Sequence, residues 1–148
     1  MVLTDSSRND MKKNTIVCIL AVGLYGLGLN AAPDFKKDVL PIIQERCIEC
    51  HGEPYLKRGR LRKPKGDYRM DSREHAIKAG DSEVAGIVPG KPDASEVIKR
   101  VVLPEDHDDI MPPKGDPLTA EQIKVLKDWI AAGAPWTAGV VIKRPPEG

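Results

Sequence analysis

The chain has 148 residues, and its 23 Lys and Arg side chains stand against 22 Asp and Glu, so the formal net charge is +1 at pH 7. This balance lacks the basic excess typical of nucleic-acid binders, and we expect no nucleic-acid partner. One Phe, two Trp and three Tyr accompany 13 Gly and 13 Pro, which predicts a thin core that a bound group would complete.

The first segment resembles an export signal. Two lysines precede an apolar run at residues 16–29, and two alanines follow it. This order is typical of a secretory signal peptide, and the run is shorter than the roughly 20 residues that span a bilayer. We predict a signal peptide over residues 1–32, with Met11 as an alternative start. The protein would then lie in the periplasm or otherwise outside the cytoplasm, with membrane association only if the signal stays uncleaved.

The next segment begins the predicted folded domain, which we place at residues 33–140, with a short tail at 141–148. Apolar residues spaced by three and four predict a helix over 35–47. Pro41 cannot donate a backbone hydrogen bond, so we expect a kink there or two short helices.

The run Cys47-Ile48-Glu49-Cys50-His51 follows directly. It has the C-x-x-C-H pattern, in which both thiols add to the vinyl groups of a haem and the histidine binds the iron. We predict one covalently bound haem c per chain, held by Cys47 and Cys50, with His51 as the proximal iron ligand. A zinc site or a dithiol redox site is the alternative, but zinc would need two further ligands, and a thioredoxin-like site would need a βαβ setting.

A basic stretch runs from Lys57 to Lys65, with no acidic residue between Glu53 and Gly66. Interleaved Gly and Pro predict an exposed loop. Such a run is most simply solvated surface. The functional alternative is a docking patch near the haem for an acidic redox partner protein.

Three more helices are expected. Capping residues and apolar spacing predict them over 71–80, 93–102 and 119–133. Asp71 is the expected cap of the first, and Thr119 with Gln122 forms a capping box for the last. No segment shows sustained alternation of polar and apolar residues, so we expect no strands.

Met111-Pro112-Pro113 is the second chemical site. A thioether is a weak, soft iron ligand, and the two prolines predict a stiff extended loop that could hold it. Met111 is therefore the predicted distal iron ligand. Its competitors are Met70, His75 and His107, and the sixth position could also be open.

The chain resembles the planctomycete-type cytochrome c domain over roughly residues 34–136. The phrases that carry the resemblance are FKKDVLPI (35–42), CIECHG (47–52), DSRE (71–74), VPGKP (88–92), MPPKG (111–115), LT (118–119) and WIAAGA (129–134). The resemblance implies an all-α, single-domain, class I-like cytochrome c fold, with crossed N- and C-terminal helices around the haem and with His51 and Met111 as axial ligands. The stretch 66–70 departs from the family pattern and follows an enlarged basic loop.

These expectations together indicate an electron carrier that works outside the cytoplasm, either alone or as a subunit of a larger oxidoreductase, and not an enzyme. Two rival classes share the haem. A haem-based sensor would release Met111 when its ligand binds, and a peroxidase-like enzyme would need a labile sixth ligand and a distal acid or base, for which His107 is the one suggestion.

Overall fold

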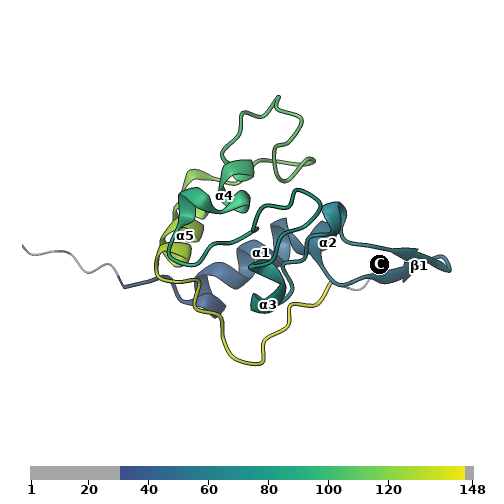
Figure 1. Ribbon diagram of the computed structural model, residues 1–148, viewed down its shortest axis with the longest axis horizontal. Helices are drawn as coiled ribbons and strands as arrows, with labels where there is room; N and C mark the ends of the chain where they lie inside the picture. The colour runs from purple at the N-terminus through teal and green to yellow at the C-terminus, as the bar shows by residue number, and fades with distance from the viewer. Residues whose placement is uncertain (1–30, 146–148) are drawn as a thin grey trace, which may run out of the picture. The chain divides into compact units, whose positions relative to one another are not determined.

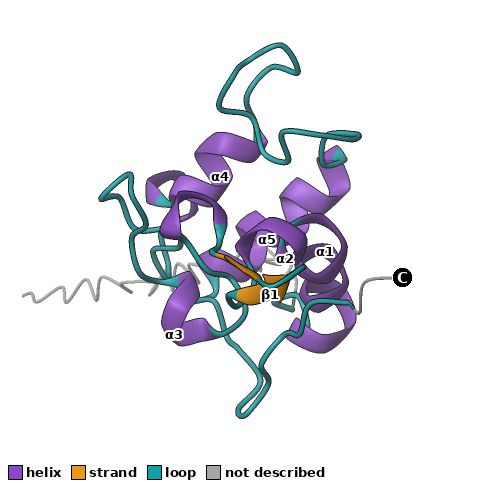
Figure 2. Ribbon diagram, turned by 90° about the vertical axis from the view of Figure 1, so that its right-hand side faces the viewer, coloured by secondary structure: helices purple, strands orange, loops and turns teal. Residues whose placement is uncertain are grey.

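The computed structural model of the chain describes residues 31–145. All but the last two residues of the predicted signal peptide lie outside this range. Within the range, no helix has both the length and the apolar character needed to cross a membrane. Figure 2 shows that helices and loops make up most of this unit.

The N-terminal part consists of three short helical segments in series: a π-helical segment η1 (Phe35–Val39), then α1 (Leu40–Arg46) and α2 (Ile48–His51) (Figure 1). Pro41 lies in the first turn of α1, where its missing N–H leaves no bond unmade. The prediction of two short helices around Pro41 is therefore confirmed. Cys47 lies between α1 and α2, at φ −123° and ψ −40°, so the motif occupies a helical turn of its own.

A β-hairpin follows α2, with strands β1 (Tyr55–Lys57) and β2 (Arg60–Arg62) paired antiparallel. The expectation that no strands form is wrong here, and the fold is helical with a small sheet and not purely all-α. Arg58 and Gly59 both have positive φ, at 50° and 73°. A two-residue turn of this kind matches the twist of a hairpin. The strands escaped prediction because three residues are too few to show alternation.

The middle of the domain carries short elements: η2 (Lys65–Asp67), α3 (Arg73–Ala76), η3 (Pro92–Ala94) and α4 (Glu96–Val101). Helix α3 is shorter than the predicted 71–80, and its cap is Ser72, whose hydroxyl accepts from the His75 N–H. Asp71 does not cap it, because the buried Asp71 carboxylate instead binds the side chains of Arg69 and His75.

Helix α5 (Ala120–Ala131) agrees best with its prediction. Thr119 and Gln122 form the expected capping box, with each side chain accepting from the other residue's backbone N–H. Gly133 follows the helix at φ 95°, a conformation that glycine adopts without strain.

The core joins the two ends of the domain. The Phe35 ring of η1 lies 6.1 Å from the Trp129 ring of α5 and 4.3 Å from the Trp136 ring. Ile142 is 2% exposed, and its N–H donates to the Asp71 carbonyl at 2.7 Å. Packing therefore continues past residue 140, where the sequence had predicted the tail to begin.

Candidate functional site

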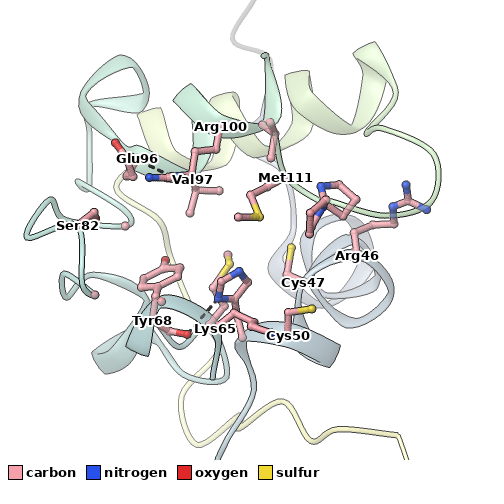
Figure 3. Close-up of a pocket in the computed structure, with 18 of the residues that line it drawn as sticks. Arg46, Cys47, Cys50, Lys65, Tyr68, Ser82, Glu96, Val97, Arg100 and Met111 are labelled. Atoms are coloured by element: carbon pink, nitrogen blue, oxygen red, sulfur yellow. Dashed lines mark hydrogen bonds and ion pairs between the residues drawn. The ribbon is translucent and has the colours of Figure 1, made fainter. Parts of the chain in front are cut away.

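One cavity of about 330 Å³ lies beside α1, α2 and the loop before α5. All four predicted site residues line it: Cys47, Cys50, His51 and Met111. Figure 3 shows Met111 and Cys47 facing the same space from different segments. Residues far apart in the sequence therefore meet at one site.

His51 is the last residue of α2, and one of its ring nitrogens is engaged in a hydrogen bond. Nδ1 lies 3.1 Å from the Tyr68 carbonyl oxygen. With Nδ1–H donating to this carbonyl, Nε2 carries the lone pair that a metal would accept. Burial also lowers the pKa of His51, which keeps the imidazole neutral near pH 7. The residue is thus prepared as a neutral nitrogen ligand.

Tyr68 holds this side of the cavity in place. Its hydroxyl donates to the Ala76 carbonyl at 2.9 Å, and its ring lies edge-on to the His51 ring at 5.4 Å between centroids. Gly86 passes so close that an added Cβ would lie 2.2 Å from ring atoms of Tyr68, and one at Gly80 would lie 2.8 Å from the Tyr68 Cβ. Both positions therefore need glycine.

The two thiols line the cavity from the turn that His51 ends. Burial raises the pKa of the Cys47 thiol to about 12, against a smaller opposing effect of the Arg46 charge. An unreacted Cys47 would stay protonated and weakly nucleophilic in the folded domain. Attachment to a haem would therefore be easiest before this turn is packed.

Met111 lies on the irregular loop between α4 and α5. Its backbone N–H donates to the Arg100 carbonyl at 3.2 Å, which fixes the start of the loop. Arg46, the last residue of α1, fixes the end: its guanidinium donates to the carbonyl oxygens of Asp116 and Pro117, the latter at 3.3 Å. Met111 is outside any helix, as its two following prolines predict.

Of the three competing residues, the two histidines are placed elsewhere. Met70 is 2% exposed and packs in the core, as expected, although it also lines the cavity. His75 is bound to Asp71, and the exposed His107 accepts from the Asp109 N–H; neither lines the cavity. Within residues 31–145, no three His, Cys, Asp or Glu side chains gather as a zinc site requires.

Sequence reasoning missed Tyr68 and Arg46. The role of Tyr68 comes partly from its carbonyl, which every residue has, so no side-chain pattern could reveal it. Arg46 contacts a loop 70 residues further along the chain. Only its place directly before the thiol motif was visible in the sequence, and that does not specify a partner.

The donor set fits a haem. The cavity combines two thiols, a neutral imidazole and a thioether, and its volume lies within the roughly 300–1,000 Å³ of small-molecule sites. A histidine anchored through Nδ1, with Nε2 left for the metal, is typical of metal-ligating histidines. The fold and the site thus define a small, mainly helical domain whose cavity is lined by two thiols, an imidazole and a thioether.

Comparison with known families agrees with this class. Residues 47–115 match the family model described as Planctomycete cytochrome C. This confirms the resemblance read from the sequence over the matched segment. A cytochrome c family implies haem binding and electron transfer. No curated protein matches the chain. No solved structure matches it either.

Proposed function

We propose that this protein is a c-type cytochrome that carries single electrons outside the cytoplasm. One observation carries the proposal: a thiol pair, a histidine with its Nδ1 committed, and a methionine on a separate loop line the same cavity. Cys47 and Cys50 would attach the haem, and His51 and Met111 would bind its iron. When bound, the haem supplies a one-electron couple, which the protein tunes through ligands and burial.

The chain's own residues would limit the movement of the iron ligands during electron transfer. Tyr68 holds the His51 ring through Nδ1, so the ring need not turn when the iron changes oxidation state. Arg46 and the Arg100 carbonyl hold the methionine loop from its two ends. Preorganised ligands of this kind reduce rearrangement during electron transfer. The class I-like arrangement of the terminal helices belongs to the same proposal.

The location rests on the sequence of the first 32 residues, which has the layout of an export signal. Covalent haem attachment outside the cytoplasm agrees with that layout. Expression with and without these residues, followed by cell fractionation, tests it. We expect the haem-bearing protein in the periplasm only when they are present, and equal recovery in the cytoplasm would contradict the location.

The function itself is tested on the full chain made with a haem-attachment system. A haem stain should survive on a denaturing gel, the haem content should be one per chain, and titration should show one reversible one-electron couple. Rapid carbon monoxide binding by the reduced protein would favour the sensor or peroxidase-like alternative, and peroxide turnover would separate those two. For the peroxidase-like alternative, the described residues bring no second histidine to the cavity.

A further inference from the structure

The β1–β2 hairpin carries a feature that the site does not use. Leu56 and Leu61 stand directly opposite each other in the two strands and are 71% and 61% exposed. Paired side chains of an antiparallel ribbon share one face. The hairpin therefore presents two adjoining leucines to solvent, the most exposed of the large hydrophobic side chains within residues 31–145.

Cations flank this leucine pair along the hairpin. Arg60 and Arg62 lie on either side of Leu61 in β2 and face the other side of the ribbon, and Arg58 lies in the turn. Arg58, Arg60 and Arg62 are exposed, and none of them forms an ion pair within residues 31–145. Lys63 and Lys65 follow, and no acidic residue occurs between Glu53 and Asp67. Strands lie about 5 Å apart and the Debye length at 0.1 M salt is about 10 Å, so these charges act together with the leucines.

The hairpin is fixed to the domain at its base. The Arg144 guanidinium lies 4.1 Å from the centre of the Tyr55 ring, and Lys143 Nζ lies 3.0 Å from a Glu53 carboxylate oxygen. Figure 1 shows the hairpin projecting from the end of α2. Tyr55 is on the opposite face from Leu56, so these contacts leave the leucines open.

Both ends of the hairpin lead to the cavity. His51 lies shortly before β1, and Lys65 and Tyr68 lie shortly after β2; all three line the cavity. A surface beside the cofactor is where an electron partner has to dock. A lipid surface at the same place would instead cover this approach, which favours a protein as the occupant.

We propose that the hairpin is the docking surface for an acidic redox protein that carries an apolar spot beside its carboxylates. This inference rests on the proposed function. Arg58, Arg60 and Arg62 steer the partner by long-range attraction, and Leu56 with Leu61 supplies the contact that excludes water. A small interface of this type suits fast, transient electron transfer.

The test uses the full haem-bearing chain and gold electrodes coated either with carboxylate-ended thiols or with a mixture of carboxylate- and methyl-ended thiols. Adsorbed mass from a quartz microbalance reports binding without involving the haem, and voltammetry reports electron exchange. We expect tighter adsorption and faster exchange on the mixed coating. The triple variant Arg58→Glu, Arg60→Glu, Arg62→Glu should lose about tenfold or more in affinity on both coatings.

The double variant Leu56→Thr, Leu61→Thr keeps residues suited to strands and removes the apolar contact. It should lose about tenfold, and only on the mixed coating. The matched charge control is Lys36→Glu, Lys37→Glu, Lys91→Glu, three exposed lysines outside the hairpin. The apolar control is Val102→Thr with Val141→Thr, at exposed positions of other segments.

Three results would overturn the inference. Hairpin variants that adsorb like the wild type would remove it, as would equal losses in the control variants. Leucine-dependent binding to phosphatidylglycerol vesicles, with no leucine effect on the electrodes, would make a lipid surface the occupant. Failure of the proposed function looks different: the haem couple would be absent in solution, while adsorbed mass would still report on the surface.

Discussion

His51 and Met111 reach the same cavity from two regions that are built differently. On the histidine side, the His51 carbonyl accepts from the Met70 N–H at 2.7 Å, and the neighbouring Ile48 and Met70 are buried. On the methionine side, the chain between α4 and α5 has no helix or strand, and Ile110 and Leu118 are its buried anchors. One ligand belongs to the packed core, and the other belongs to a loop tied down at its ends.

This difference predicts which of the two iron ligands should be released more easily. Local opening has the lowest free energy where few buried contacts oppose it. Release of Met111 needs only the loop to move, whereas release of His51 would disturb the turn that also carries both thiols. The account therefore predicts a firm histidine side and a more easily opened methionine side.

The largest effect should come from breaking the thiol pair. We expect the variant Cys47→Ser, Cys50→Ser to lose all covalently bound haem, because a hydroxyl does not add to a vinyl group as a thiol does. A haem stain on a denaturing gel measures this. Cys18→Ser, a change to the cysteine within the predicted signal peptide, is the control and should keep full staining. Stain retained in the double variant would contradict the assignment.

Loss of the methionine should open the distal side and leave the histidine side intact. In Met111→Ala we expect rapid carbon monoxide binding and a midpoint potential lowered by on the order of 100 mV, within the about 0.8 V range set by axial ligands. Stopped-flow mixing and a redox titration measure these. Met70→Leu, a volume-conserving change, is the control that should leave both unchanged.

A smaller effect is expected from untying the methionine loop. Arg46→Gln removes the guanidinium bonds to Asp116 and Pro117. Losing these hydrogen bonds costs about 1 kcal/mol, which should raise the population with an open iron position roughly fivefold. The carbon monoxide binding rate of the reduced protein reports that population. Arg73→Gln, which loses a bond to the Ala134 carbonyl instead, should not change the rate. Equal rates in both variants would show that Arg46 does not tie the loop.

The smallest effect should be on the histidine side. Tyr68→Phe removes the hydroxyl bond to the Ala76 carbonyl and should lower the free energy of unfolding by about 1 kcal/mol. Iron ligation should not change, because His51 is held by the Tyr68 backbone carbonyl. Denaturant unfolding and the haem spectrum measure the two properties. Tyr55→Phe is the control, and a changed spectrum in Tyr68→Phe alone would show a less firm histidine side than described.

The sequence predicted the features that depend on local patterns. The capping box at Thr119 and Gln122 and the interruption near Pro41 both follow from the chemistry of a few neighbouring residues. The C-x-x-C-H run and the Met-Pro-Pro run could likewise be singled out, since each has unusual chemistry at a fixed spacing.

Features that depend on distant contacts could not be predicted. Asp71 was expected to cap a helix, but it is buried between Arg69 and His75, and tertiary contacts overrode its local preference. The contact of Arg46 with the methionine loop has no local signature. The hairpin was hidden by the shortness of its strands, so the exposed leucine pair appeared only in the structure.

The most direct measurement is the far-red absorption of the oxidised, haem-bearing protein, where sulfur ligation of ferric haem gives a weak band. The account predicts this band in the wild type and its absence in Met111→Ala, with the haem still covalently attached in both. A wild-type spectrum without the band, or a band that persists in Met111→Ala, would contradict the assignment of His51 and Met111 as the two iron ligands.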